Sequence, residues 1–180
     1  MSIESLNAFS MDFFSLKGKT AIVTGGNSGL GQAFAMALAK AGANVFIPSF
    51  VKDNGETKEM IEKQGVEVDF MQVDITAEGA PQKIIAACCE RFGTVDILVN
   101  NAGITRDNLL MRMKDDEWDD IIATNLTSIY RMSKACMRGM TKAKKGRIIS
   151  ISSVVGATGN PGQTNYAAAK AGVVGFSKSL

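Results

Sequence analysis

A short strand-type run that stops at a glycine-rich turn constrains the fold of this chain more than any other feature. The run is Thr20–Val23, the turn is Thr24-Gly25-Gly26-Asn27-Ser28-Gly29-Leu30-Gly31, and helix formers follow over residues 32–41 up to Gly42. A strand, a tight turn and a helix in this order begin a βαβ unit. We therefore expect the chain to open with a parallel strand and its crossover helix.

The same alternation continues along the rest of the sequence. Further strand-type runs occupy residues 44–50, 66–73, 96–99 and 147–151, and helical patterns occupy residues 56–64, 80–92, 115–139 and 165–180. Strands separated by helices require right-handed crossovers and a mainly parallel sheet. The predicted fold class is α/β, a Rossmann-like doubly wound parallel sheet in three α/β/α layers. The sequence contains no linker or repeat, so residues 1–180 are predicted to form a single domain.

The last predicted helix stops at Leu180 without a capping residue or a returning strand. A doubly wound sheet usually has a sixth strand. We therefore expect that the last strand or strands of the domain are missing and that the chain is truncated at its C-terminus.

The composition removes several classes of function. Twenty basic and eighteen acidic residues leave a net charge of +2, which gives no support to a nucleic-acid partner or a membrane surface. The sequence contains no histidine, so histidine-based nucleophile schemes, zinc sites and acid–base catalysis are excluded. We predict no metal site, and any proton transfer must use other side chains.

The cysteines and the N-terminus indicate a cytoplasmic protein. Cys88, Cys89 and Cys136 lie inside apolar helical patterns without C-x-x-C spacing, so we expect buried thiols in a reducing compartment. The N-terminus has no signal-peptide core, and no apolar run is long enough to span a membrane.

The glycine-rich turn has a specific chemical use in this position. Gly25 permits the tight turn, Gly29 lets the backbone approach a pyrophosphate, and Gly31 lets the helix pack closely. The helix N-terminus adds free N–H groups and the positive end of its dipole. The turn therefore predicts a dinucleotide-binding domain.

The T-G-x-x-x-G-x-G spacing resembles the short-chain dehydrogenase/reductase family, and later motifs of that family follow in order. These are Asp74 after the third strand, the Asn100-Asn101-Ala102-Gly103 turn, Asn125 in the long helix, Ser153, and Tyr166-Ala167-Ala168-Ala169-Lys170. The resemblance places Asp74 at the end of that strand, against the adenine. The cofactor-binding residues that it implies are Thr24, Gly25, Asn27, Ser28, Gly29, Leu30, Gly31, Ser49, Asp74, Ile75, Asn101, Ala102, Gly103, Tyr166 and Lys170.

Tyr166 and Lys170 lie four residues apart, on one face of a helix. A free tyrosine titrates near ~10, and a cation at ~5 Å in a dielectric of ~20 favours the phenolate by about 3 kcal/mol, roughly two pKa units. The pair can therefore exchange protons near neutral pH without histidine.

The resemblance assigns the catalytic roles. It implies that Tyr166 protonates the substrate carbonyl as hydride arrives, and that Ser153 polarises the same oxygen. Lys170 would also hold the nicotinamide ribose, and Asn125 would support a water relay to the lysine. An alternating strand would turn Ser152 to the opposite face, so we prefer Ser153 to its neighbour.

Cofactor choice depends on the end of the second strand. Family members that prefer NAD carry an acid there, whereas this chain has Ser49. Neither Ser28 nor Phe50 is the basic residue that often marks NADP preference, although Lys52 could reach a 2′-phosphate. Without an acid to repel a phosphate, we expect NADP(H) rather than NAD(H).

The two parts of the chain resemble different members of the family. Residues 95–180 resemble the 3-oxoacyl-[acyl-carrier-protein] reductases of bacterial fatty-acid synthesis, in which an arginine at the position of Arg138 helps to dock the acidic carrier protein. Residues 1–94 resemble sugar-acid dehydrogenases such as gluconate or 2-dehydro-3-deoxygluconate 5-dehydrogenases. Two explanations of this difference stay open: the chain is a natural intermediate between the two groups, or it is a splice of two family members. We expect the reductase, with an NAD-dependent sugar-acid dehydrogenase and a catalytically silent nucleotide-binding protein as alternatives. The resemblance also implies a homotetramer.

Overall fold

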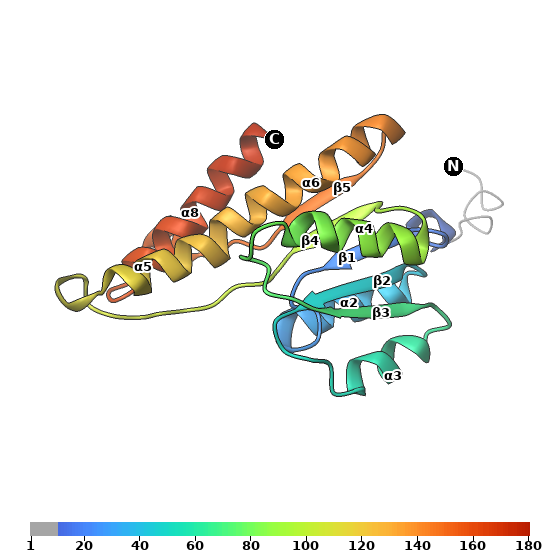
Figure 1. Cartoon of the computed structure of the whole chain (residues 1–180), viewed down its shortest axis with the longest axis horizontal. Helices are drawn as coiled ribbons and strands as arrows, with labels where there is room; N and C mark the ends of the chain where they lie inside the picture. Colours follow the sequence, from blue (N-terminus) through green and yellow to red (C-terminus); the bar gives the residue numbers. More distant parts are fainter. Residues whose placement is uncertain (1–10) are drawn as a thin grey trace, which may run out of the picture.

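Five parallel strands form one sheet in the order β3-β2-β1-β4-β5 in the computed structural model, which describes residues 11–180. The strands are β1 (Thr20–Val23), β2 (Asn44–Ser49), β3 (Val68–Gln72), β4 (Ile97–Asn100) and β5 (Arg147–Ser150). The helices are α2 (Gly29–Lys40), α3 (Glu56–Glu62), α4 (Ala80–Phe92), α5 (Asp115–Ile122), α6 (Ser128–Ala143), α7 (Val155–Thr158) and α8 (Thr164–Ser179), as Figure 1 shows. This topology confirms the predicted α/β doubly wound parallel sheet.

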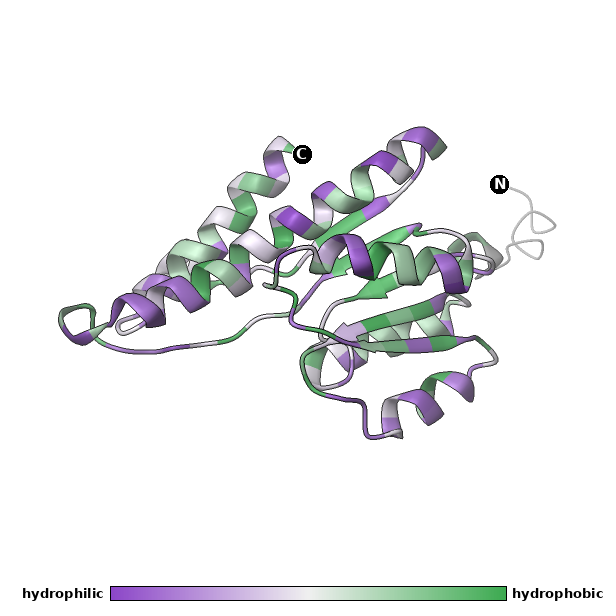
Figure 2. Cartoon of the chain, in the orientation of Figure 1, coloured by the Kyte–Doolittle hydropathy of each residue, from purple (hydrophilic) through white to green (hydrophobic). Residues whose placement is uncertain are grey.

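Alternating side chains of the strands build a separate core on each face of the sheet. Ala21 and Val23 pack with α2 and α3, whereas Ile22, between them, packs with α4 and α6. A strand sends successive side chains to opposite faces, so a fully apolar run is what a strand covered on both sides requires. In Figure 2 most strand residues are coloured as hydrophobic, whereas hydrophobic and hydrophilic residues alternate along the helices.

The region expected as one long helix over 115–139 is interrupted. Helix α5 ends at Ile122, a π-helical turn η3 spans Ala123–Thr127, and α6 continues from Ser128. π-turns insert one extra residue per turn and are common at functional sites. The short helix α7 and the 3₁₀ turns η1 (Met11–Phe14) and η2 (Leu110–Arg112) were also not predicted, because periodicity is not visible in so few residues.

The expectation for the N-terminal segment is only partly met. Leu16 packs against the core beside α2, but Phe13 and Phe14 are 84% and 60% exposed. Residues 1–10 of the predicted lead-in lie outside the described residues. Within residues 11–180, no helix is both long enough and apolar enough to cross a membrane.

The three cysteines differ in exposure. Cys88 and Cys136 are buried as predicted, but Cys89 is exposed, because neighbouring helix positions face different sides. Burial raises the pKa of the Cys88 and Cys136 thiols to about 12.

Thiolate is the reactive form of cysteine, so one thiol of the native chain is expected to react quickly with a disulfide reagent at about pH 8. All three thiols should react in denaturant. The C89S variant should lose the fast phase, and a fast phase that persists in it would contradict the burial of the other two thiols.

Candidate active site

A cavity of about 970 Å³ opens beyond the carboxyl ends of β1, β2 and β4. Parallel doubly wound sheets bind ligands at this position, where the strand order reverses. The predicted cofactor residues that line it are Gly25, Asn27, Ser28, Leu30, Gly31, Ser49, Asp74, Ile75, Asn101, Ala102 and Gly103. The remaining loop residues, Thr24 and Gly29, do not line it.

Thr24 joins the glycine-rich turn to the Asn-Asn-Ala-Gly turn. Its Oγ1 accepts hydrogen bonds from the backbone N–H groups of Asn101 and Ala102, both at 3.0 Å. The Asn101 side chain in turn donates to the Thr24 carbonyl at 3.0 Å. The glycine-rich turn and the Asn-Asn-Ala-Gly turn are thereby held as one wall of the cavity.

Gly31 has no room for a side chain. A Cβ atom there would lie 2.2 Å from the Gly25 carbonyl oxygen and 2.5 Å from Nδ2 of Asn101. Gly31 stands in the first turn of α2, so its lack of a side chain lets the helix N-terminus approach both turns. This is the close packing that the glycine spacing predicted.

Ser49 is the last residue of β2, one residue before the end of the predicted run 44–50, and it is 8% exposed. Its hydroxyl donates to Oδ1 of Asn27 at 2.8 Å, and Nδ2 of Asn27 donates to the Val51 carbonyl at 2.9 Å. The exposed Phe50 and the exposed Lys52 also line the cavity. The lining residues 48–52 include no carboxylate, and Asp74 lines the cavity from the neighbouring segment after Val73.

Asp74 does not end a strand, because β3 stops two residues earlier at Gln72. The predicted end of the strand was wrong since Val73 pairs only through its N–H, which donates to the Ser49 carbonyl. Oδ1 of Asp74 accepts hydrogen bonds from the backbone and the hydroxyl of Thr76, at 2.8 and 2.6 Å. The carboxylate therefore shapes the loop that faces the cavity.

Tyr166 and Lys170 stand one turn apart on α8, with Nζ of Lys170 5.6 Å from the centre of the tyrosine ring. Tyr166 is half-buried, whereas Lys170 is only 4% exposed. Its ammonium group donates to the Ile151 carbonyl at 2.7 Å. Burial lowers the pKa of Lys170 below its ordinary value.

The two candidate serines follow β5, which ends at Ser150, so strand alternation does not separate them. The hydroxyl of Ser152 donates to the Lys170 carbonyl at 2.8 Å. Oγ of Ser153 accepts the N–H of Val155 at 3.2 Å, and its own proton remains available to a ligand. The preference for Ser153 therefore remains a prediction. Its physical reason is now that the Ser152 proton is bonded to the Lys170 carbonyl, whereas the Ser153 proton is available.

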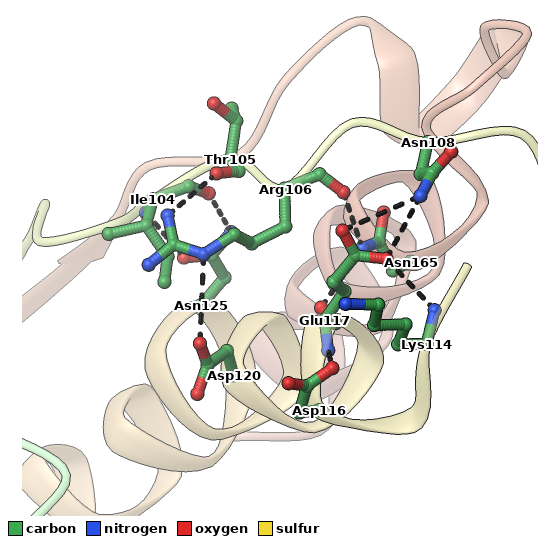
Figure 3. Close-up of polar contacts among 10 residues, drawn as sticks. All are labelled: Ile104, Thr105, Arg106, Asn108, Lys114, Asp116, Glu117, Asp120, Asn125 and Asn165. Carbon is green, nitrogen blue, oxygen red and sulfur yellow. Dashed lines mark hydrogen bonds and ion pairs between the residues drawn. The ribbon is translucent and has the colours of Figure 1, made fainter. Parts of the chain in front are cut away.

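Asn125 lies in the π-turn η3 and is completely buried. Its Oδ1 accepts the N–H of Ile104 at 2.9 Å, and its Nδ2 donates to the Ile104 carbonyl at 2.8 Å. Figure 3 shows this pair of bonds holding the loop that follows β4. The side chain thus positions the loop, while the water relay implied for this residue remains a prediction.

The four predicted catalytic residues do not line the cavity itself. The structure pairs Tyr166 with Lys170 and brings Asn125 to the Gly103–Ile104 edge of the cavity. Sequence reasoning missed several lining residues, among them Arg106, Asp120 and Thr124. Nε of Arg106 lies 3.6 Å from Oδ2 of Asp120 (Figure 3), an ion pair between an irregular loop and α5 that no local spacing reveals.

Comparison with known proteins agrees with this geometry. The family model for short chain dehydrogenases matches residues 19–180. The chain is 69% identical over 179 residues to the uncharacterized oxidoreductase YgcW of Escherichia coli K12, which covers 99% of this chain and 69% of that protein. It is 54% identical over 166 residues to the 3-oxoacyl-[acyl-carrier-protein] reductase FabG of Salmonella typhimurium, which covers 92% of this chain and 67% of that protein.

A solved structure shows the same likeness in three dimensions. It is a protein of Sinorhizobium meliloti 1021 assigned as a short-chain alcohol dehydrogenase, and it matches with a TM-score of 0.90 at 34% identity. The match covers 93% of this chain and 67% of that one. The chain thus spans about two thirds of the length of these relatives.

Proposed function

The chain belongs to the short-chain dehydrogenase family of NAD(P)-dependent oxidoreductases, and we propose that it reduces 3-oxoacyl thioesters of acyl carrier protein with NADPH. The observation that carries the chemistry is the buried Lys170 beside Tyr166, together with the glycine-lined cavity. The observation that favours the substrate is 54% identity to a 3-oxoacyl-[acyl-carrier-protein] reductase over 92% of this chain.

The residues that line the cavity are suited to bind a dinucleotide cofactor. The cavity holds the free N–H groups at the start of α2, and Gly31 keeps them accessible. When bound, the nicotinamide supplies a hydride to the carbonyl carbon of the substrate. The wall of the cavity at Ser49 has no carboxylate to repel a 2′-phosphate, and Lys52 adds a cation there, which favours NADPH.

The side chains of α8 and of the segment after β5 would carry the proton. Tyr166 donates its hydroxyl proton to the carbonyl oxygen, which becomes the 3-hydroxyl group of the product. Lys170 stabilises the phenolate that remains, and Ser153 donates a hydrogen bond to the same oxygen. The buried position of Lys170 strengthens its electrostatic effect on the tyrosine, because water screens it little.

The exposed face of α6 supports an acidic protein partner. Arg131, Lys134, Arg138 and Lys142 recur at helical spacing, and α6 contains no acidic residue. Such a stripe attracts a negatively charged carrier and orients its approach. The carrier contact at Arg138, the homotetramer and the cytoplasmic location all remain predictions.

The S49D variant is expected to shift cofactor preference towards NADH. A carboxylate at the end of β2 accepts hydrogen bonds from a ribose 2′-hydroxyl and repels a 2′-phosphate, so the ratio of NADPH to NADH affinity should fall by about tenfold or more. Titration of both cofactors by fluorescence measures the ratio. The S49A variant is the matched control, because it removes the bond to Asn27 without adding charge. An equal change in both variants would contradict the charge explanation.

A sugar-acid dehydrogenase is the second candidate, from the resemblance of residues 1–94. The relative with 69% identity is an uncharacterized oxidoreductase, so it does not favour the 3-oxoacyl substrate of FabG (54%). The deciding experiment follows oxidation of NADPH and NADH by this chain with an acetoacetyl thioester and, separately, with keto sugar acids. Oxidation with the thioester alone supports the reductase, and oxidation with sugar acids alone replaces it by the second candidate. Cofactor binding without turnover on either would support the silent nucleotide-binding alternative.

A further inference from the structure

Asn165 precedes Tyr166 on α8 and is completely buried. Its Oδ1 accepts the N–H of Tyr166 at 2.8 Å. Its Nδ2 donates to the Arg106 carbonyl at 2.9 Å and to the Glu117 carbonyl at 3.1 Å. The side chain thus joins three elements, α8, the loop after β4 and α5, as Figure 3 shows for the last two.

Two of these bonds satisfy groups that have few other partners. The N–H of Tyr166 lies in the first turn of α8, where helix N–H groups have no intrahelical acceptor. The N-cap residue Gln163 makes no capping bond with its side chain. The carbonyl of Arg106 lies in an irregular loop. Asn165 therefore replaces the missing cap and fixes the loop with the same amide.

The loop after β4 is also held on either side of this point. Asn125 bonds both backbone groups of Ile104. Farther along, the N–H of Asn108 donates to the Gly162 carbonyl at 2.9 Å, just before α8. Arg106, whose carbonyl Asn165 holds, lines the cavity with its side chain. The loop that edges the cavity and the helix that carries Tyr166 are thus connected through one buried side chain.

We propose that Asn165 is a positioning residue that sets Tyr166 against the cavity loop Ile104–Asn108. This inference rests on the proposed function, which makes Tyr166 the proton donor. Loss of the link leaves the tyrosine hydroxyl and Lys170 in place on α8 but removes the buried bonds to the loop. Of the hydrogen bonds within residues 11–180, only those of Gly162 with Asn108 and of Gln163 with Asp107 then still join the loop to the start of the helix. The proton is then delivered from a less defined position, which slows the chemical step more than it weakens cofactor binding.

Two substitutions separate the bond of Asn165 to the Tyr166 N–H from its bonds to the Arg106 and Glu117 carbonyls. The N165A variant removes all three bonds, whereas N165D keeps an acceptor for the Tyr166 N–H and loses the amide donors to Arg106 and Glu117. The N160A variant is the matched control, because Asn160 is an exposed asparagine in the preceding turn that bonds only Gln163. N165A and N165D are expected to lower kcat about tenfold or more, with KM for NADPH within about twofold. N160A should change neither.

Hydrogen exchange measured by mass spectrometry tests the bonds of Asn165 independently of catalytic activity. In N165A the segments 104–113 and 164–168 should exchange faster together, while 20–49 keeps its protection. In N165D only 104–113 should lose protection. Unchanged exchange over 104–113 in both variants, or kcat of N165D within about twofold of the parent, would overturn the proposal. If the parent chain reduces neither substrate class, the proposed function fails and the exchange result alone decides on the link.

Discussion

Replacement of Tyr166 by phenylalanine is expected to abolish measurable turnover while NADPH binding stays within about twofold. The substitution removes one oxygen and keeps the ring that stands 5.6 Å from Nζ of Lys170. A general acid contributes about 10²–10⁴-fold, and loss of the only proton donor of the pair should reach the upper end, about 5 kcal/mol in the barrier. Oxidation of NADPH with the acetoacetyl thioester measures the loss, and fluorescence titration measures binding.

The chain contains a second pair of the same kind that provides the control. Tyr130 and Lys134 lie four residues apart on α6, with Nζ of Lys134 5.5 Å from the ring centre and 3.1 Å from the tyrosine hydroxyl. This pair is exposed, and no motif of the family includes it. The Y130F variant should therefore keep full turnover. Equal losses in Y130F and Y166F, or full activity in Y166F, would remove Tyr166 from the mechanism.

The two tyrosine–lysine pairs also show what a short motif can predict. Their spacing is identical, so the spacing alone does not distinguish a catalytic pair from a surface pair. Only the order of the other motifs along the chain identified Tyr166 and Lys170. The structure adds the physical difference, since Lys170 is 4% exposed and bonded to the Ile151 carbonyl, whereas Lys134 is exposed. Burial depends on tertiary packing, which local spacing does not contain.

The centre of the sheet was predictable because β1, β2 and β4 are covered on both faces. Runs such as Ala21–Val23 are apolar throughout, and this makes them visible without knowledge of their neighbours. The end of β3 was misplaced because Val73 continues the alternation of apolar residues, although it pairs with β2 only through its N–H. Phe13 and Phe14 were misplaced because hydrophobicity alone does not show whether a surface is available to cover a side chain.

The cavity loop after β4 was the least predictable part of the site. The bonds of Asn125 to Ile104, the ion pair of Arg106 with Asp120 and the bonds of Asn165 to the Arg106 and Glu117 carbonyls join segments that are apart in sequence. None has a period or a spacing that a single sequence reveals. The glycine loop is the opposite case, because its steric requirement is local to a few residues.

Substitution of Gly31 by alanine is expected to weaken NADPH binding by at least about tenfold and to destabilise the fold. The new methyl group would lie 2.2 Å from the Gly25 carbonyl oxygen and 2.5 Å from Nδ2 of Asn101, so the first turn of α2 must move away from both turns. Overpacking of this kind costs about 1–3 kcal/mol, or roughly 2–10 °C in Tm for a chain of this size. The displaced N–H groups no longer converge on a phosphate.

The G139A variant tests whether the loss arises from contact rather than from the loss of a glycine. Gly139 is also helical, in α6, but a Cβ atom there meets nothing within 4 Å. Alanine in an exposed helix interior is more stable than glycine by about 0.5–1 kcal/mol, so G139A should raise Tm and leave NADPH affinity unchanged. Thermal melting with and without cofactor measures both variants. The geometry predicts Tm changes of opposite sign. An unchanged or raised Tm in G31A would show that α2 can shift without strain and that Gly31 is not required for the approach of the helix to the cofactor loop.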